Sequence, residues 1–329
     1  MQFRTRVRLV VGAAAVVLAS TSAWAQADAY PSKPIRLVVP FPAGGPTDIA
    51  ARVIGQAVAE DLKTSIVIDN KGGAHGFIGA SEAARSKPDG YTLMMASIGT
   101  MAINPGLYSK MPYDPNGDFE PLSLVLTVPI VLVANPGKIA ANTVPELVSY
   151  LKQNPHKVNY ASAGAGGSSH LVPEYFKYRT ETDMTHIPYK GAGPAVSDLV
   201  AGQVDVMFDT LLTSTTFVNN GKLKMLAVTT RERLPQYPNV PTVAEALGVK
   251  DFEASSWYAM YAPKGTDASI VSKLSESIER VLKQPNIVAR MAELGALPAG
   301  GKPEVLRNFQ KSEQDKWLQV IKAADIKPN

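Results

Sequence analysis

Apolar and polar positions along this chain follow two alternating patterns, short apolar runs and longer runs with helical spacing. Residues 35–39 are apolar except for one arginine, which predicts a buried strand. After them, Ile49, Val53 and Ala57 recur every four residues, a spacing typical of a helix with one apolar face. Because such alternation continues through most of the chain, the sequence predicts an α/β fold in which crossover helices join parallel strands.

The remaining elements follow from the same two patterns. Further strands are expected at residues 65–69, 91–96, 158–161, 184–187 and 204–208. Further helices are expected within residues 73–85, at residues 144–153, after Ser169, and at residues 194–201, 242–247, 269–283, 287–294 and 303–324.

A long β-prone run at residues 122–134 is interrupted by Pro129. Proline is unfavourable inside a central strand, so we expect two strands that meet at a bend and form a first crossing between two lobes. Residues 223–229 would form the return crossing. A domain that is interrupted by another one and joined to it twice has a hinge architecture. The predicted lobes are residues 26–126 plus 229–329 (lobe 1) and residues 127–228 (lobe 2).

The first 25 residues have the pattern of a cleavable signal peptide. Arg4, Arg6 and Arg8 precede an apolar run, and Ala23-Trp24-Ala25 fits a small-x-small cleavage site. We expect cleavage after Ala25 and a location in the periplasm. Loss of the three arginines lowers the formal net charge from +4 to +1, so charge gives no support to nucleic-acid binding.

Cysteine is absent from the sequence. This excludes disulfides, thiolate metal sites, a thiol nucleophile and a lipid-modified cysteine that would tether the chain. The four histidines show no metal-ligand spacing such as HExxH, and no nucleophile-elbow or Walker motif occurs. We therefore expect no metal, no cofactor and no catalytic residue.

Two segments read as a strand, a glycine-rich loop and a helix, at residues 35–48 and 158–170. A helix N-terminus presents unpaired backbone N–H groups and a partial positive charge, which attract carboxylate or phosphate. Glycine allows that backbone to approach a ligand closely. Two such loops, far apart in an exported chain, predict a ligand held between two lobes.

The roles of several side chains in these loops have two interpretations. Phe41 is either core or a pocket wall, and Thr47 can hydrogen-bond an anion. Asp48 either complements the helix dipole or selects an amino or hydroxyl group. Ser168 and Ser169 are natural N-caps whose hydroxyls would also face a bound anion.

The second loop, Gly164-x-Gly166-x-x-Ser169, comes close to the dinucleotide fingerprint but ends in serine, and a diffusible nicotinamide cofactor is not expected outside the cytoplasm. A third strand-to-helix junction at residues 186–194 contains Tyr189, which could stack on a ligand, and Lys190, either a solvated residue or a source of charge. Asp209 ends a strand directed towards the same region.

Six motifs occur in a fixed order: PFPAGGPTDIAAR, SKPDGYTLMMAS, ASAGAGGSSHL, HIPYKGAGPAVSDLVAGQVDVMFD, KLKMLAVTTRERLPQYPNVPTVAEA and SSWYAMYAPKGT. In these the chain resembles the Bug-type substrate-binding proteins, the periplasmic receptors of tripartite tricarboxylate transporters. The resemblance implies a two-lobed periplasmic-binding-protein fold of the second type, with two parallel or mixed sheets. It also implies a small carboxylate ligand and a membrane transporter with one large and one small subunit.

The resemblance also implies a pocket. Its residues would be Phe41, Ala43, Gly44, Thr47 and Asp48 from lobe 1, with Ser97 and Thr100 at the edge, and Ser162, Ala163, Ser168, Ser169 and His170 from lobe 2, with Tyr189 and Asp209 nearby. The sequence departs from the family pattern at residues 70–77, where His75 and Phe77 replace the usual glycine and asparagine. We therefore add His75 to the expected ligand-binding residues.

Together these features predict a monomeric binding protein without catalysis. Its ligand would be a dicarboxylate or tricarboxylate, an amino acid or an aromatic acid, delivered to membrane transporter subunits. Two alternatives remain open: a sensor of the same fold acting on a membrane signalling partner, and a periplasmic hydrolase suggested by Ser169 beside His170.

Overall fold

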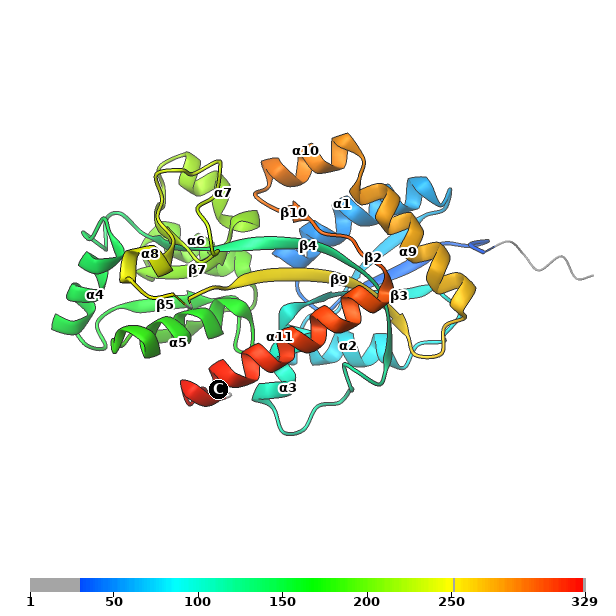
Figure 1. Cartoon of the computed structure of the whole chain (residues 1–329), viewed down its shortest axis with the longest axis horizontal. Coiled ribbons are helices and arrows are strands. Elements are labelled where there is room, and N and C mark those ends of the chain that lie inside the picture. The colour runs from blue at the N-terminus through cyan, green and yellow to red at the C-terminus, as the bar shows by residue number, and fades with distance from the viewer. Residues whose placement is uncertain (1–29, 251, 328–329) are drawn as a thin grey trace, which may run out of the picture. The chain divides into compact units, whose positions relative to one another are not determined.

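A computed structural model describes residues 30–250 and 252–327 of the protein. The predicted signal peptide and its cleavage site after Ala25 lie outside these residues. From Lys33 onward the chain forms one unit, built on a ten-stranded mixed sheet with helices on both faces (Figure 1).

The strands are β1 Ile35–Val39, β2 Ile66–Asn70, β3 Thr92–Ser97, β4 Phe119–Ala134, β5 Asn159–Ser162, β6 Thr185–Pro188, β7 Val206–Thr210, β8 Lys224–Val228, β9 Ser255–Pro263 and β10 Leu297–Pro298. The α-helices are α1 Pro46–Asp61, α2 Phe77–Ala84, α3 Asn104–Leu107, α4 Val144–Gln153, α5 Ser168–Thr180, α6 Ala192–Ala201, α7 Leu211–Asn219, α8 Val243–Leu247, α9 Ala268–Leu282, α10 Pro285–Glu293 and α11 Pro303–Ala323. A 3₁₀ turn, η1 Ala74–Gly76, precedes α2, and a π-helical turn, η2 Gly99–Ile103, follows β3.

The sheet has a parallel group of strands at each end and an antiparallel centre. Its order is β2-β1-β3-β9-β4-β7-β5-β6, and β8 and β10 also pair with β4. Strand β1 runs parallel to β2 and β3, and β5 runs parallel to β6 and β7. The predicted α/β fold with parallel and mixed pairing is confirmed.

The prediction of two strands at residues 122–134 was wrong, because β4 is a single strand of 16 residues. Pro129 lies where pairing with β9 ends, opposite Ser255, and directly before pairing with β7 begins at Ile130. A proline lacks the N–H that a ladder needs. At this change of partners its absence is tolerated, so the strand continues.

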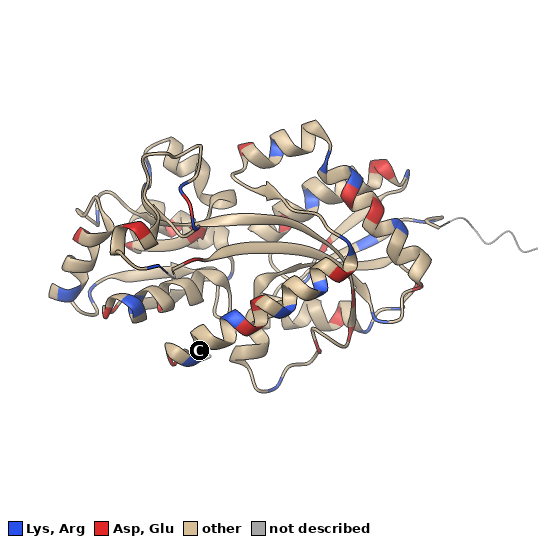
Figure 2. Ribbon diagram, viewed as in Figure 1, with Lys and Arg blue, Asp and Glu red and all other residues tan. Residues whose placement is uncertain are grey.

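Strand β9 occupies the centre of the sheet, yet residues 255–263 were not among the predicted strands. It pairs antiparallel with both β3 and β4, and eight of its nine residues are buried. A strand covered on both faces has no polar alternation and therefore lacks the usual sequence signal. The long middle parts of β4 and β9 carry no charged residue, whereas charges are frequent on α9 and α11 (Figure 2).

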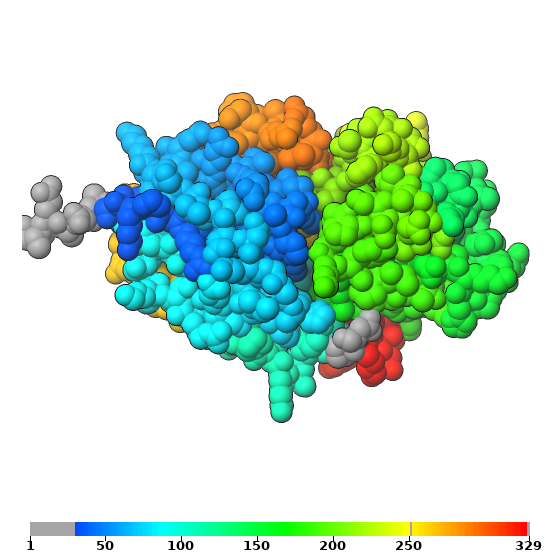
Figure 3. Space-filling model, turned by 180° about the vertical axis from the view of Figure 1, so that it is seen from behind, coloured from blue at the N-terminus to red at the C-terminus, as the bar shows by residue number. Residues whose placement is uncertain are grey.

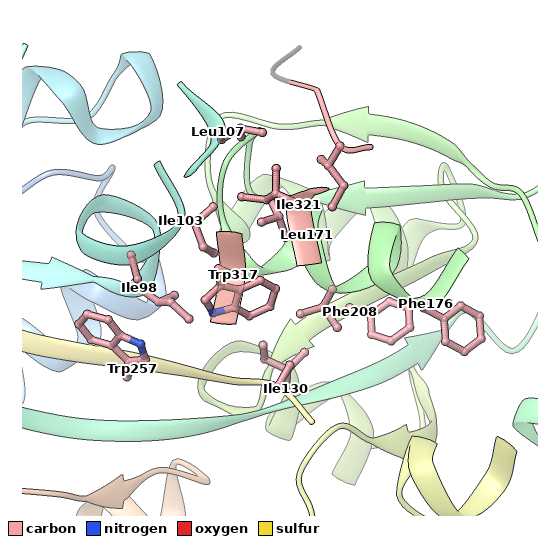
Figure 4. Packing of buried hydrophobic residues seen from close by; sticks show 14 of the residues in the cluster. Ile98, Ile103, Leu107, Ile130, Leu171, Phe176, Phe208, Trp257, Trp317 and Ile321 are labelled. Atoms are coloured by element: carbon pink, nitrogen blue, oxygen red, sulfur yellow. The ribbon is translucent and has the colours of Figure 1, made fainter. Parts of the chain in front are cut away.

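Helix α11 is held to the centre of the sheet through a buried carboxylate. Glu313 Oε2 accepts hydrogen bonds from Trp257 Nε1 on β9 (3.1 Å) and from Trp317 Nε1 on α11 (3.2 Å). Both indoles belong to the apolar core, which also contains Ile98 and Phe208 (Figure 4). Since the last two residues also reach the cavity described below, the core forms part of its wall.

Helix α8 and Phe252 pack against the half of the fold that contains α4 and α5. Thr242 caps α8 in a reciprocal capping box with Glu245. The Phe252 ring stacks on Tyr175 of α5, with 4.9 Å between centroids, and meets Phe176 edge-on at 6.3 Å. The chain then continues into β9, which pairs with β3.

Candidate functional site

Three helix N-termini meet at one cavity. Helices α1, α5 and α6 follow strands β1, β5 and β6, and their N-caps are Gly45, Gly167 and Gly191. None of these glycines has a side chain that could cap the helix, so the first amide groups of each helix remain available to a ligand. Three partial positive charges are thereby directed at one space.

The cavity has a volume of about 80 Å³, room for a small organic acid or several water molecules. It is lined by Phe41, Pro42, Ala43, Gly45, Pro46, Thr47, Ser97, Ile98, Gly99, Ala163, Gly167, Ser168, Ser169, Lys190, Gly191, Ala192, Gly193, Pro194, Phe208, Asp209, Thr210, Ser256 and Tyr258. Lys190 is the only lysine or arginine among these described lining residues, and its side chain is exposed.

A wider space of about 780 Å³ adjoins the cavity and shares with it Phe41, Pro42, Gly99, Ala163, Gly167, Lys190 and Gly191. Its remaining wall comes from residues 72–76, from residues 164–166 of the second glycine loop, and from Pro188 and Tyr189. Seen from behind, the surface is hollowed along the seam between its blue-cyan and green parts (Figure 3). We call this wider space the mouth.

The second glycine loop approaches residues from the opposite side of the mouth. His75 Nδ1 lies 3.0 Å from the backbone oxygen of Ala165. A carbonyl only accepts, so Nδ1 carries the proton in this contact. The His75 ring stacks on Tyr108, with 5.2 Å between centroids. A Cβ at Gly166 would lie 2.8 Å from Asn104 Oδ1, so only glycine fits there.

Side chains already occupy three amide groups of the second glycine loop. Ser169 Oγ accepts from Ala163 N (2.9 Å), Ser162 Oγ accepts from Gly164 N (3.2 Å), and His170 Nδ1 accepts from Gly166 N (3.3 Å). These three predicted site residues therefore shape the loop. Only Ser169 of the three also lines the cavity.

Two stacked histidines pack against this loop, His170 buried and His186 partly buried. His170 and His186 stack at 4.3 Å, and His186 stacks on Tyr160 at 4.8 Å. Burial lowers the pKa of His170 to about 4, and nearby Lys177 adds to the effect. Burial, with His170 next, lowers the pKa of His186 to about 4 as well. Both rings are therefore neutral at neutral pH, which leaves His170 Nδ1 free to accept the Gly166 hydrogen bond.

Asp48 serves the first glycine loop in a similar way. Its Oδ2 accepts from Gly44 N (2.8 Å) and from Arg52 Nε (2.9 Å). Burial raises the pKa of this carboxyl, but the hydrogen bonds from Arg52 and Gly44 outweigh burial and the net pKa is lowered. Asp48 does not line the cavity or the mouth.

Asp209 is a buried carboxyl in the cavity wall, 3% exposed, at the end of β7. Its Oδ2 accepts hydrogen bonds from the hydroxyls of Thr213 and Ser214, both at 2.5 Å. Burial raises the pKa of Asp209 to about 6, and these two hydroxyls limit the increase. Tyr258 lines the same wall and accepts a hydrogen bond from Ser256 (3.2 Å).

Three other predicted residues, Thr100, Tyr189 and His75, do not line the cavity. Thr100 Oγ1 accepts a hydrogen bond from Ser97 N and donates one to Ser97 O, and Thr100 lines neither the cavity nor the mouth. Tyr189 lines the mouth, and burial followed by its hydrogen bond to Asp198 raises its pKa to about 12. His75 lines the mouth as well.

The structure thus brings most predicted site residues together. Those that line the cavity are Phe41, Ala43, Thr47, Ser97, Ala163, Ser168, Ser169 and Asp209, and those that line neither space are Gly44, Asp48, Thr100, Ser162 and His170. A ligand-binding role for each of them stays a prediction.

Sequence reasoning missed other parts of the wall. Ser256 and Tyr258 were missed because strand β9 was not predicted. Gly191 and Gly193 could have been found, since the third junction repeats the glycine-then-proline signal of the first. Within residues 30–250 and 252–327, no three His, Asp or Glu side chains lie in a metal-binding arrangement. No helix in the same residues has the length and apolar character needed to cross a membrane.

Known proteins are similar to this chain over nearly its whole length. The family described as "Tripartite tricarboxylate transporter family receptor" matches residues 50–326. The solved structure of the periplasmic binding protein BugD is 39% identical, with a TM-score of 0.86, and the match covers 91% of this chain and 99% of that one.

Two further solved structures contain a bound carboxylate. Rpa4515 of R. palustris with adipate is 37% identical with a TM-score of 0.88, over 91% of this chain and 100% of that one. MatC of Rhodopseudomonas palustris with malate is 35% identical with a TM-score of 0.83, over 89% of this chain and 100% of that one.

Proposed function

Because the chain belongs to the tripartite tricarboxylate transporter receptor family, we propose that it captures a small carboxylate in the cavity and delivers it to the membrane subunits of such a transporter. The observation that carries this proposal is the convergence of three glycine-capped helix N-termini on one cavity. The family is described as one of receptors. The carboxylates bound in the Rpa4515 and MatC structures support the ligand class.

Backbone amides and hydroxyls supply the binding contacts. In the described part of the chain, the hydroxyls of Thr47, Ser97 and Ser168 line the cavity and make no hydrogen bond. Hydrogen bonds to a charged group contribute roughly 1.5–3 kcal/mol each, so a few of them give micromolar binding after the cost of ordering the ligand. No guanidinium group is needed for this mode of capture.

Binding closes two lobes around the ligand. The α1 side of the cavity belongs to lobe 1, and the α5 and α6 side belongs to lobe 2. The ligand touches both sides only when they are closed, so its differential affinity shifts the hinge equilibrium. The His75–Ala165 contact belongs to the closed arrangement. The packing of Phe252 on α5 favours a return crossing near β9, later in the chain than residue 229.

The protein acts in the periplasm as a monomer, after removal of residues 1–25. A sensor of the same fold is the second candidate, since a closed lobe pair can signal to a membrane partner as well as to a transporter. Deletion of the gene separates these two roles: loss of uptake supports transport, and loss of gene induction supports sensing. A hydrolase is disfavoured because Ser169 and His170 each bond a loop amide. Turnover of a bound carboxylate by the purified protein would support the hydrolase function instead.

The test is a thermal-shift screen with monocarboxylates, dicarboxylates, tricarboxylates, amino acids and aromatic acids, followed by calorimetry on the strongest binder. Thr47→Val removes one free hydroxyl at constant volume and should weaken binding roughly 10-fold, while Thr47→Ser keeps the hydroxyl and should stay within about 3-fold. If no acid raises the melting temperature of the wild type, the proposal fails. Equal affinities of the two variants would show that the Thr47 hydroxyl does not bind the ligand.

A further inference from the structure

A buried carboxyl group lies in the wall of the cavity in which we place an anionic ligand. Asp209 lines this cavity, and its carboxyl has no ion-pair partner in the described part of the chain. Lys190, which lines both the cavity and the mouth, is exposed to solvent. A second anionic group next to Asp209 would therefore meet a like charge in a poorly solvated place.

The orientation of this carboxyl group is fixed by its neighbours. The hydroxyls of Thr213 and Ser214 both donate to Oδ2 and tie that oxygen to helix α7. The backbone N–H of Thr210 also donates to the carboxyl group. No described side chain donates to Oδ1, and a carboxylate oxygen has two lone pairs, so Oδ1 can still accept a hydrogen bond from a molecule in the cavity that Asp209 lines. With its pKa raised to about 6 by burial, Asp209 is mostly ionised at pH 7.5 and can only accept hydrogen bonds.

We propose that Asp209 sets the ligand specificity by accepting a hydrogen bond from a hydroxyl or ammonium group of the bound carboxylate. The ligand carboxylate then lies at the N-termini of α1, α5 and α6, and its donor group faces Oδ1. An acid without a donor would leave the Asp209 charge desolvated and unpaired, which costs more than a hydrogen bond that is merely absent. This inference rests on the proposed function and narrows its substrate class to hydroxy- or amino-carboxylates.

The first experiment uses the wild type and matched acids at pH 7.5. The probes form two sets of three acids that differ in one group. The first set is malate, 2-methylsuccinate and succinate, with aspartate as the ammonium analogue. The second set is lactate, 2-methylpropionate and propionate, with alanine as the ammonium analogue. Methyl replaces hydroxyl at similar size but cannot donate. Calorimetry should show the hydroxy or amino acid binding at least about 10-fold more tightly than the methyl acid in one or both sets. Binding of the methyl acids within about 2-fold of their donor-bearing partners, or no binding of any donor-bearing probe, overturns the inference.

The second experiment removes the acceptor. In Asp209→Asn the hydroxyls of Thr213 and Ser214 hold the amide oxygen and turn the NH₂ group towards the cavity. The preference for the hydroxy acid should then fall to within about 2-fold or reverse, whereas Thr47→Val should weaken both acids by the same factor. An unchanged preference in Asp209→Asn overturns the inference. The proposed function fails separately, when no carboxylate of the wider screen binds the wild type.

Discussion

Acidification should destabilise this protein through the two stacked histidines that pack against the second glycine loop. His170 and His186 have a pKa of about 4 in the folded chain, mainly because they are buried. The usual value near 6.5 applies when the chain is unfolded. Between these values the unfolded chain binds more protons than the folded one, so stability is lost as the pH falls from 6.5 towards 4. Replacing His170 with asparagine should remove one of these two protons and keep an acceptor for the Gly166 amide.

The magnitude follows from the two pKa values. Between pH 7.5 and 4.5, one such histidine lowers the free energy of unfolding by about 2.5 kcal/mol. Asp209 acts in the opposite direction, because its pKa is raised to about 6 and the folded chain binds its proton first as the pH falls. The wild type and the variant share the Asp209 contribution and the burial of His186, which is the main cause of its lowered pKa. The difference between their pH dependences therefore reports the loss of His170 together with its smaller effect on the pKa of His186.

The assay is urea denaturation of the ligand-free protein at pH 7.5 and 4.5, followed by tryptophan fluorescence. His170→Asn should be less stable than the wild type at pH 7.5 by about 1–2 kcal/mol, since ring packing is lost. It should also lose about 2.5 kcal/mol less on acidification. His156→Asn is the control for the loss of a histidine at the surface, because the His156 side chain is 77% exposed, contacts Asp183 and lies outside the stacked pair. A His170→Asn protein with the full wild-type pH dependence would refute the reasoning.

Three further predictions concern the loops around the cavity. His75→Phe keeps an aromatic ring but removes the donor to Ala165 O, so calorimetry should show roughly 3- to 10-fold weaker binding, and unchanged affinity would argue against the cross-cleft contact. Gly44→Val forces a β-branched residue into φ +79°, so it should weaken binding while the circular dichroism spectrum stays native, and wild-type affinity would contradict this. Ser169→Ala leaves the Ala163 amide without its acceptor and should cost about 1–3 kcal/mol of stability together with affinity, as denaturation and calorimetry at one pH can show.

The glycine loops show how far sequence reasoning reaches into a site. The local signal of a strand, glycines and a helix start is strong, and all three such junctions lie at the cavity. The same signal does not tell whether a hydroxyl meets the ligand or the loop itself. Ser169 and Thr47 look alike in sequence, yet the first bonds a loop amide and the second is left free. Competition between these two uses is decided by geometry within a few tenths of an ångström.

The sequence by itself determined the alternation of strands and helices, the position of the loops and the family, because these depend on local periodicity, capping and ordered motifs. Only the tertiary structure decided that Pro129 lies inside one strand, that β9 brings Ser256 and Tyr258 to the wall, and that Asp209 lines the same cavity as α1. These outcomes depend on pairing between segments that lie far apart in the sequence, such as Ile130 with Thr210 and Pro129 with Ser255. A proline is tolerated where the strand changes its pairing partner. The local pattern determines whether a segment forms a strand, a loop or a helix, and long-range packing determines which other segments it contacts.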